Sequence, residues 1–403
     1  RGVGGRSVNR RAVVAGAGYA GLTAAVALLQ RGWRVHVVER AASIRSEGYS
    51  IAFHENGLRT LEALGLLERA LEQAAPMPAR QTRDRRGRVT SSFDADYRVV
   101  RIARPHLVGL LAEEATRLGG RIDCGAAAMA AEPSGRLRLA DGAMIEGDLI
   151  VAADGVMSPL RDGLGLLDRI EESREGALRA VLTRVPGEMG PDDDGRTGFE
   201  FWSGRRRFMY RVAAAGSAYL TFTARDDDAA ARRLPLDAAL WGAAFPTCAE
   251  VIARAARDVD WSATRWAPFR TVRLAAWSRG RVAVVGDAAH AMAPNLAQCG
   301  NCAMMNALAL AHHVDAAEDV AAGLSEWERV ERPVIEHTQR WSRRFTAPQA
   351  LPEWLWTRLL PPLARSRWVR EAVTRAPRRA PTGWPAVIAA AGAGSRNVAP
   401  RTP

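Results

Sequence analysis

A glycine-rich turn near the N-terminus has the residue types and spacing of a phosphate-binding loop. It reads G-x-G-x-x-G and consists of Gly16, Ala17, Gly18, Tyr19, Ala20 and Gly21. The turn lies between an apolar strand pattern at 12–15 and an Ala- and Leu-rich helix pattern at 22–30. Glycines permit the tight turn, the close approach of a pyrophosphate and the packing of helix on strand, while the helix N-terminus offers free N–H groups to phosphates.

A carboxylate follows the turn at the distance expected for ribose binding. Glu39 ends the apolar run 35–38, about 20 residues after the glycines. Such a carboxylate accepts hydrogen bonds from the ribose hydroxyls and repels a 2′-phosphate. The first nucleotide is therefore predicted to be FAD or NAD, and not NADP.

Two further acidic turns follow buried-strand patterns. Asp154 and Gly155 come after the apolar run 149–152, and Gly286 and Asp287 come after the run 281–285. A carboxylate in such a turn can bind a polyol hydroxyl, and the helix that starts at Asp287 could direct its N-terminus at an anionic ring.

These motifs, in this order and spacing, resemble those of the class A (single-component) FAD-dependent flavoprotein monooxygenases of the aromatic-hydroxylase type. The resemblance covers roughly residues 11–345, and it includes G-D-A-A-H-x-x-x-P at 286–294. It implies that the first turn binds the FAD pyrophosphate, Glu39 the adenosine ribose, and Asp287 the ribityl chain. The residues it assigns to the cofactor are Gly16, Gly18, Tyr19, Ala20, Gly21, Glu39, Arg40, Arg45, Arg104, Asp154, Gly155, Gly286, Asp287, Pro294, Ala297, Gln298, Cys299, Gly300 and Asn301.

The resemblance also implies an activity. In such enzymes NADPH or NADH reduces FAD, and O2 then adds to give a C4a-hydroperoxyflavin that transfers oxygen to an electron-rich substrate. The protein positions the flavin and excludes water from the peroxide. The expected function is hydroxylation or epoxidation of a bulky aromatic or polyketide-like small molecule, in secondary metabolism.

The sequence departs from the family in the loop after Pro294. The family pattern is P-x-x-G-Q-G-x-N, followed by D-A. This sequence has Ala297 and Cys299 in place of the two glycines, and Asn306 in place of the aspartate. Side chains at 297 and 299 could displace the ring or alter the loop. They motivate an alternative function, a redox-neutral cyclisation or rearrangement in which FAD is a scaffold.

Cys299 and Cys302 also form C-x-x-C at the start of a helix pattern. A helix N-terminus lowers a thiol pKa, so a flavin-linked dithiol oxidoreductase is a second alternative. Covalent flavin attachment at Cys299 is another interpretation. A structural zinc site would be one ligand short, because only His290 lies near the two thiols in the sequence. The simplest interpretation is two small residues in an Ala-rich helix start.

The elements that must position these motifs are typical of a two-part α/β fold with a Rossmann-like unit. We predict a disordered N-terminus at 1–11, an FAD-binding domain at 12–74, 101–164 and 276–345, and a substrate domain at 75–100 and 165–275. Segment 346–403 is predicted to form helices, at 354–360 and 368–376, and a flexible tail. The substrate domain shows strand patterns without intervening helices, which favours an antiparallel sheet. The aromatic side chains predicted to contact substrate are Trp202, Tyr210 and Phe222.

Composition limits the remaining possibilities. The 403 residues carry a net charge of +12, but all 56 basic residues are arginine and they are dispersed, so no nucleic-acid partner is predicted. Four cysteines do not make a disulfide framework, which favours a cytoplasmic protein. The longest apolar run, 12–29, contains glycines and lacks the layout of a signal peptide or a membrane span. We expect a monomer or homodimer with a small-molecule substrate, O2 and no metal.

Overall fold

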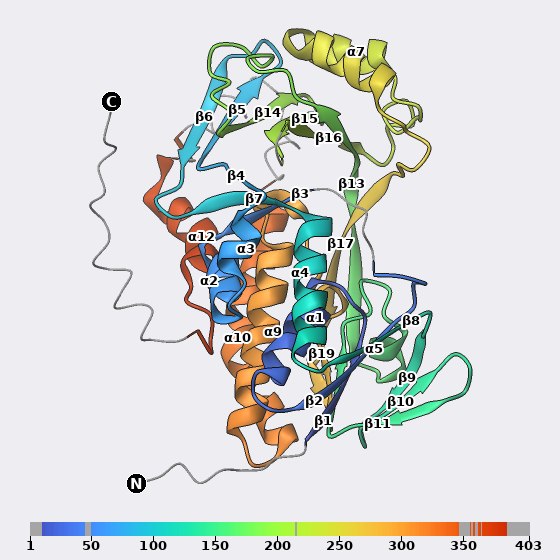
Figure 1. Ribbon diagram of the computed structural model, residues 1–403. Helices are drawn as coiled ribbons and strands as arrows, with labels where there is room; N and C mark the ends of the chain where they lie inside the picture. The colour runs from blue at the N-terminus through green and yellow to red at the C-terminus, as the bar shows by residue number, and fades with distance from the viewer. Residues whose placement is uncertain are drawn as a thin grey trace.

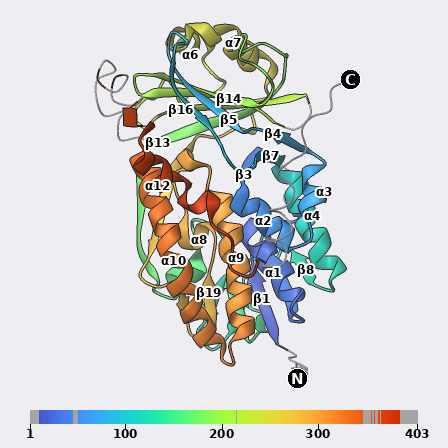
Figure 2. The ribbon, with the colours of Figure 1, turned by 90° about the vertical axis from the view of Figure 1, so that its left-hand side faces the viewer.

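The structure is a computed structural model that describes residues 10–44, 50–213, 216–345, 355, 358, 362–363 and 365–384. It has a lower part of helices and a parallel sheet, and an upper part formed by a larger sheet with short helices above it (Figure 1). A 90° turn shows the same two parts, with the larger sheet lying across the tops of the long helices (Figure 2). The candidate site lies where the two parts meet.

The parallel sheet carries the glycine-rich turn. Its order is β18-β19-β12-β1-β2-β8, and its strands are β1 (Arg11–Ala15), β2 (Arg34–Glu39), β8 (Arg121–Cys124), β12 (Leu149–Ala152), β18 (Ser278–Arg279) and β19 (Val282–Val284). Only the short β18 pairs antiparallel. Because β1, β2, β12 and β19 are parallel, their carboxyl ends meet at one edge, and the three predicted motifs therefore converge.

Helices cover one face of this sheet, and a small sheet packs on its other side (Figure 1). The main helices are α1 (Tyr19–Leu29), α4 (Arg104–Arg117), α9 (Cys299–Ala316) and α10 (Val320–Arg344). The small sheet has β9 (Ala128–Glu132), β10 (Arg136–Leu139) and β11 (Met144–Glu146), with α5 (Pro159–Gly163) beside it. Helix α1 is buried along nearly its whole length, since α4 and α9 both pack on it. Its Ala- and Leu-rich composition suits that position.

The larger sheet has the order β17-β13-β16-β15-β14-β5-β6. Its strands are β5 (Ala79–Asp84), β6 (Val89–Asp94), β13 (Leu167–Thr183), β14 (Thr197–Ser203), β15 (Arg206–Val212), β16 (Ser217–Arg225) and β17 (Ala267–Leu274). It is antiparallel except for the pair β14 and β5. The long strand β13 pairs with both β16 and β17 and connects the upper part to the lower part (Figure 1).

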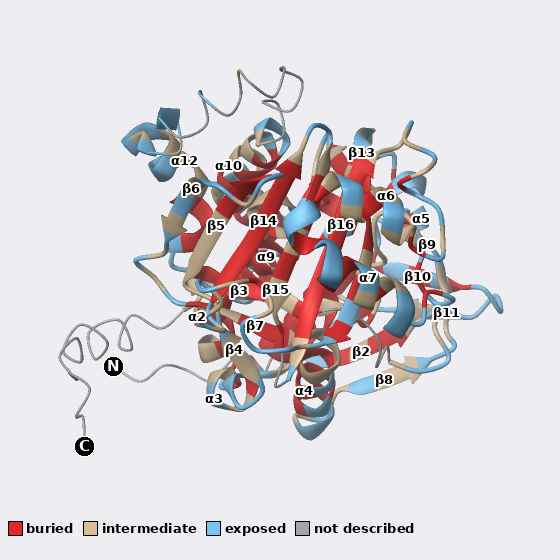
Figure 3. Cartoon of the chain, turned by 90° about the horizontal axis from the view of Figure 1, so that it is seen from above, coloured by how far each residue is buried: buried red, intermediate tan, exposed pale blue. Residues whose placement is uncertain are grey.

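The expectation of strands without helices between them is wrong for 226–266. This segment contains α6 (Ala238–Ala244), the short 3-10 turn η1 (Pro246–Cys248) and α7 (Ala249–Asp258). These elements cover the upper face of the sheet. The view from above shows that most of the sheet strands beneath them are buried (Figure 3). Trp241 of α6 and Ile252 of α7 are fully buried against it. The aromatic upper face of the sheet needs this cover, because it would otherwise lie in water.

The remaining elements frame the junction between the two parts. A three-stranded sheet contains β3 (Ser50–His54), β4 (Ala74–Pro76) and β7 (Val99–Ala103), and the helices are α2 (Glu55–Ala63), α3 (Leu67–Leu71), α8 (Asp287–His290) and α12 (Arg367–Arg378), with the 3-10 turn η2 (Pro294–Leu296). No helix among the described residues is both long and apolar enough to cross a membrane.

Several boundary predictions change. Arg11 already belongs to β1, and the Arg10 guanidinium donates to the carbonyl oxygen of Val314 at 2.9 Å, so these two residues are ordered. Residues 1–9 lie outside the described residues, as does almost all of the helix expected at 354–360. The helix expected at 368–376 is confirmed as α12. Strand β5 was not predicted.

Candidate active site

The glycine-rich turn has the geometry that a pyrophosphate requires. Gly16 has φ +109°, and a Cβ there would collide with the carbonyl oxygen of Ala153. A Cβ at Gly21 would collide with the carbonyl oxygen of Gly16, so only glycine lets α1 start this close to β1. At Gly18 a Cβ would meet nothing within 4 Å, which leaves open space beside the N-terminus of α1.

Glu39 lies at the end of β2, beside this turn. Its carboxylate accepts from the backbone N–H groups of Ala17 at 2.8 Å and of Ala41 at 3.0 Å. The carboxylate is thus fixed at the edge of the turn, where remaining lone pairs can accept from hydroxyl groups. Arg40 follows it, and Arg45 lies outside the described residues.

The two acidic turns also converge at this edge. Asp154 is mostly buried, and burial raises the pKa of its carboxyl group. Asp287 starts α8, and burial raises its pKa as well, although Arg104 counteracts the rise. Arg161 joins the two turns, because its guanidinium donates to the carbonyl oxygens of Val156 at 3.0 Å and Ala288 at 3.1 Å. Sequence reasoning missed this fully buried arginine, since nothing in the D-G motif marks it.

Buried polar atoms without partners indicate what this edge could hold. Among the described residues, Asp154 Oδ1 and Arg104 Nε are buried and make no hydrogen bond. Buried polar groups normally have partners, so these atoms are suited to a ligand that carries hydroxyls and phosphates. Together with the open space at Gly18, they fit FAD. The Arg104 guanidinium also lies 5.4 Å from the centre of the Tyr19 ring, so both predicted residues face the same region.

The altered loop keeps a glycine-like backbone despite its side chains. Ala297 has φ 52° and ψ 34°, and it is the only non-glycine residue with positive φ in the described part of the chain. The Asn301 amide donates to the carbonyl oxygens of Ala297 and Ala52, both at 2.9 Å, and its oxygen accepts from the His54 N–H at 3.0 Å. Asn301 therefore fixes the loop to β3.

Gln298 adds a second link between the loop and its surroundings. Its side-chain oxygen accepts from Asn56 of α2 at 3.0 Å, while its nitrogen is buried without a partner among the described residues. Asn56 Oδ1 is likewise unpaired. Gly300, at the start of α9, faces Ile51. The loop predicted to face the flavin is therefore held from two elements that precede it by about 250 residues.

The two cysteines do not have the environment of a reactive dithiol. The Cys299 thiol donates to the carbonyl oxygen of Met292 at 3.2 Å. Burial, followed by the charge of Asp287, raises its pKa to about 12. Burial also raises the pKa of Cys302, which is fully buried in α9. Both cysteines are free thiols, and neither is poised to form a thiolate.

His290 and Asn306 form a buried polar pair behind the loop. His290 Nε2 lies 3.4 Å from Asn306 Oδ1, and the Trp327 indole donates to the Asn306 carbonyl oxygen at 3.1 Å. Burial lowers the pKa of His290 to about 4, so the ring is neutral. A carboxylate at 306 would favour the protonated ring, whereas Asn306 allows it to stay uncharged. Both residues are structural here.

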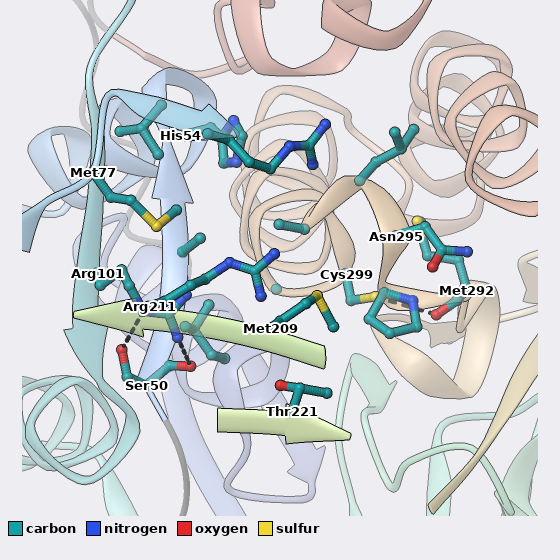
Figure 4. A pocket seen from close by; sticks show the side chains of 18 of the residues that line it. Ser50, His54, Met77, Arg101, Met209, Arg211, Thr221, Met292, Asn295 and Cys299 are labelled. Carbon is teal, nitrogen blue, oxygen red and sulfur yellow. Dashed lines mark hydrogen bonds between the residues drawn. The ribbon is translucent and has the colours of Figure 1, made fainter. Parts of the chain in front are cut away.

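A cavity of about 490 Å³ extends from this loop to the lower face of the larger sheet. On one side are Asp287, Met292, Pro294, Ala297, Cys299 and Gly300. On the other are sheet residues that include Met209, Arg211, Tyr219 and Thr221. In Figure 4 the Arg211 guanidinium points into the space between the side that carries His54 and Met77 and the side that carries Met292 and Cys299. Helix α12 closes part of the wall with Val373, Thr374 and Pro377.

The predicted substrate residues Tyr210 and Phe222 do not line this cavity. Alternate residues of a strand point to opposite faces. Both side chains are fully buried on the upper face, in the aromatic cluster with Trp241 and Phe245. Trp202 lies on the lower face but is buried and does not itself line the cavity; its indole donates at 2.8 Å to Glu200, and the Arg207 guanidinium lies over its ring, and both of these residues line the cavity.

The residues of the lower face that sequence reasoning missed include several arginines. On β15 the cavity face is formed by Arg207, Met209 and Arg211, which alternate with Phe208 and Tyr210 of the upper face. That period-2 pattern was a usable signal, because a strand covered on both faces can carry an aromatic set on one face and a polar set on the other. On β7, Arg101 lines the cavity too, although only 3% of its surface is exposed.

Comparison with known proteins agrees with this geometry. Residues 10–341 match the family described as "FAD binding domain". The chain is 41% identical over 361 residues to the 2-heptyl-3-hydroxy-4(1H)-quinolone synthase of Mycobacteroides abscessus, a match that covers 88% of this chain and 95% of that protein. It is 30% identical to the 3-amino-4-hydroxybenzoate 2-monooxygenase of Streptomyces cremeus, in a match that covers 85% of this chain and 88% of that protein. Among solved structures, the tetrameric form of 2-methyl-3-hydroxypyridine-5-carboxylic acid oxygenase matches with a TM-score of 0.84 and 33% identity, covering 94% of this chain and all of that one.

Proposed function

We infer the reaction from the family to which the chain belongs, the class A FAD-dependent flavoprotein monooxygenases of the aromatic-hydroxylase type. The proposal is that the protein adds one oxygen atom of O2 to the ring of an oxo- or hydroxy-substituted heteroaromatic compound, with NADPH or NADH as reductant. The favoured substrate is a 4-quinolone with an alkyl group at C2, hydroxylated at C3. The products would be the 3-hydroxyquinolone, water and NAD(P)⁺.

One observation carries this proposal. A single cavity joins the loop from Met292 to Gly300, which the family resemblance places against the flavin, to a substrate-sized space under the larger sheet. A volume of about 490 Å³ lies in the usual range for small-molecule sites. The quinolone is favoured because the relative of 41% identity is named for a 3-hydroxy-4(1H)-quinolone and spans nearly the same length.

The residues at the nucleotide edge would hold FAD in this reaction. Gly18 and the N-terminus of α1 would accommodate the pyrophosphate, Glu39 the ribose, and Asp154 and Asp287 the hydroxyls of the connecting chain. When bound, FAD supplies the transfer of electrons from NAD(P)H to O2 that makes one oxygen atom electrophilic. The loop from Met292 to Gly300 and α12, which both line the cavity, would exclude water from that oxygen.

The backbone of the altered loop supports an oxygenase over the redox-neutral alternative. Ala297 adopts the left-handed conformation that a glycine would take, and Asn301 holds it there. The loop therefore accommodates Ala297 in the conformation that a glycine would take. The Cys299 side chain turns its thiol toward the carbonyl oxygen of Met292, so its polar group is already bonded within the loop.

The test is anaerobic mixing of the FAD-loaded protein with NADPH or NADH, with and without 2-heptyl-4(1H)-quinolone, followed by admission of air. The proposal expects loss of the oxidised-flavin absorbance, rapid reoxidation, and a product heavier by one oxygen atom that carries ¹⁸O when ¹⁸O2 is used. A flavin that neither nucleotide can reduce would favour the redox-neutral function. Reduction without any oxygenated product would reject the quinolone.

The assembly state is a separate part of the proposal. We propose a monomer or homodimer, while the oxygenase with 33% identity has been crystallised as a tetramer. Light scattering of the FAD-loaded protein distinguishes a mass near 43.6 kDa from its multiples.

A further inference from the structure

The wall of the cavity that β5, β7 and β15 form contains an excess of largely buried positive charge. Arg80, Arg101, Arg207 and Arg211 come from three different strands and lie near one another. In the described part of the chain, the carboxylates that form ion pairs with this group are Glu200 and Glu175, so four guanidiniums stand against two carboxylates. Buried charges are normally paired, which makes such an excess informative about a ligand.

The available pairing neutralises mainly Arg207. Its guanidinium lies 3.2 Å from Glu175 and 3.5 Å from Glu200, and it also donates to Asn295 at 3.1 Å. Arg211 reaches Glu200 only at 3.9 Å, although just 14% of its side chain is exposed. Burial acts to raise the pKa of Glu200, but Arg207, Arg80 and Arg211 outweigh it and hold that pKa below its ordinary value.

Among the residues that the structure describes, Arg101 has only neutral partners. Its guanidinium donates to the hydroxyl and the carbonyl oxygen of Ser50, at 3.0 and 2.6 Å, and it lies 4.8 Å from the centre of the Tyr219 ring. Burial, followed by repulsion from Arg211, lowers its pKa to about 9. Arg80 makes no hydrogen bond or ion pair with the described residues and stacks over Phe345 at 5.5 Å. Figure 4 shows Arg101 turned toward Ser50 and Arg211 extended into the cavity.

We propose that Arg101 and Arg211 form an anion subsite that binds the ring oxygen of the aromatic substrate as an oxyanion. This inference rests on the proposed function and specifies the ionisation state of its substrate. The charged and titratable groups that face Arg211 are Arg80, Arg101, Glu200, Arg207, Tyr219 and His54. Burial and the nearby Arg80 lower the pKa of His54 to about 3, so that ring is neutral and cannot supply a further charge.

The subsite would assist the reaction by shifting a proton equilibrium. A 4-quinolone loses the proton of its ring N–H, or of the hydroxyl in its tautomer, to solvent, and the resulting charge is shared between the oxygen and the ring carbon next to it. That carbon is C3, the position that receives the electrophilic oxygen. Two guanidiniums in a region of low dielectric stabilise this conjugate base and lower the pKa of the bound ligand. Arg101 and Arg211 are then specificity-determining residues.

The test uses the FAD-loaded full chain and a chromophoric probe, 4-nitrophenol, whose anion absorbs visible light. The proposal expects bound 4-nitrophenol to ionise at a pH at least about one unit below that of the free compound. Arg211→Gln should weaken binding of the anion by about tenfold or more and reduce the shift. Arg211→Lys should retain part of the pKa shift. The uncharged 4-nitroanisole should bind equally well to all three proteins.

Arg206→Gln is the matched control. It removes the same charge from the same strand, but Arg206 lies on the upper face, where it pairs with Asp228 at 2.8 Å. Retained FAD absorbance and an unchanged circular dichroism spectrum establish that each variant is folded. Arg101→Gln is informative only with that control, because its hydrogen bonds to Ser50 join β7 to β3.

Two results would overturn the inference. One is an unchanged pKa for the bound probe, and the other is equal behaviour of Arg211→Gln and Arg206→Gln. If the probe pKa is unchanged while benzoate binds in a way that depends on Arg211, the anion is a carboxylate and not a ring oxygen. If the probe shift is observed but quinolone hydroxylation is not, the subsite stands and the proposed function fails.

Discussion

The amide of Asn301 donates to the carbonyl oxygen of Ala297 at 2.9 Å, and Ala297 is in the left-handed region at φ 52°. The same side chain binds β3 through Ala52 and His54. An unfavourable backbone conformation persists when its surroundings fix it, and here one amide does so from the first turn of α9. The loop that lies between the nucleotide edge and the substrate cavity is therefore held in place by Asn301, only four residues after Ala297.

Replacing Ala297 by glycine should stabilise the protein. An L-residue in the left-handed region costs about 1–2 kcal/mol, and the greater freedom of glycine in the unfolded chain offsets part of the gain. We expect Ala297→Gly to raise the free energy of unfolding by about 0.5–1 kcal/mol, measured by urea denaturation. The control is Ala253→Gly on the exposed side of α7, which should lower it by a similar amount. A loss of stability in Ala297→Gly would contradict the assignment of strain to this residue.

Glu39 should govern the affinity for FAD. Its carboxylate is fixed by Ala17 and Ala41 at the side of the turn where the ribose is expected. Glu39→Ala removes a charged acceptor, so we expect FAD to bind at least about tenfold more weakly, as measured by the fluorescence of released flavin. Asp148→Ala serves as the comparison, because Asp148 binds the Arg11 N–H at the opposite end of β1. Equal affinities of the two variants would show that the ribose is bound elsewhere.

The stability of the protein should fall in mildly acidic solution. Burial holds the pKa of His290 at about 4, below its ordinary value of 6.5, so the unfolded chain binds a proton more readily than the folded one. The contribution of this residue is fully present above about pH 6.5 and is lost as the pH falls toward 4, with a total of about 3 kcal/mol. His54 adds to the same trend.

The measurement is the urea midpoint at several pH values between 4 and 8. His290→Gln should be less stable at neutral pH, because it disturbs a buried contact, but its stability should change less with pH over this range. A variant whose pH dependence equals that of the parent protein would mean that other groups cause the acid sensitivity.

Cys302 should be dispensable for flavin reduction. Burial raises the pKa of the Cys302 thiol and of the Cys299 thiol, so neither forms a thiolate readily. A dithiol mechanism needs both sulfurs. We expect Cys302→Ala to retain the rate at which NAD(P)H bleaches the flavin, with only a modest loss of thermal stability from the smaller side chain. A large fall in that rate at unchanged FAD content would revive the dithiol oxidoreductase.

The sequence by itself determined the nucleotide-binding unit and the family. Gly16, Gly21 and Glu39 act within one βαβ unit, where local spacing fixes their relative positions, and the order of the three motifs specifies the rest of that edge. It also identified Ala297 as unusual, since the departure from a glycine pattern can be read without a structure.

Only the tertiary structure decided which residues face the substrate cavity. Tyr210 and Arg211 are neighbours on β15, yet they point to opposite faces of the sheet, and the pattern alone did not say which face α6 and α7 would cover. Glu200 and Arg211 lie on the paired strands β14 and β15, whereas Arg101 lies on β7 of another sheet and far from them in the chain, so its proximity to Arg211 arises only from the packing of the two sheets. Electrostatic pairing depends on distance in space, and sequence separation carries almost no information about it.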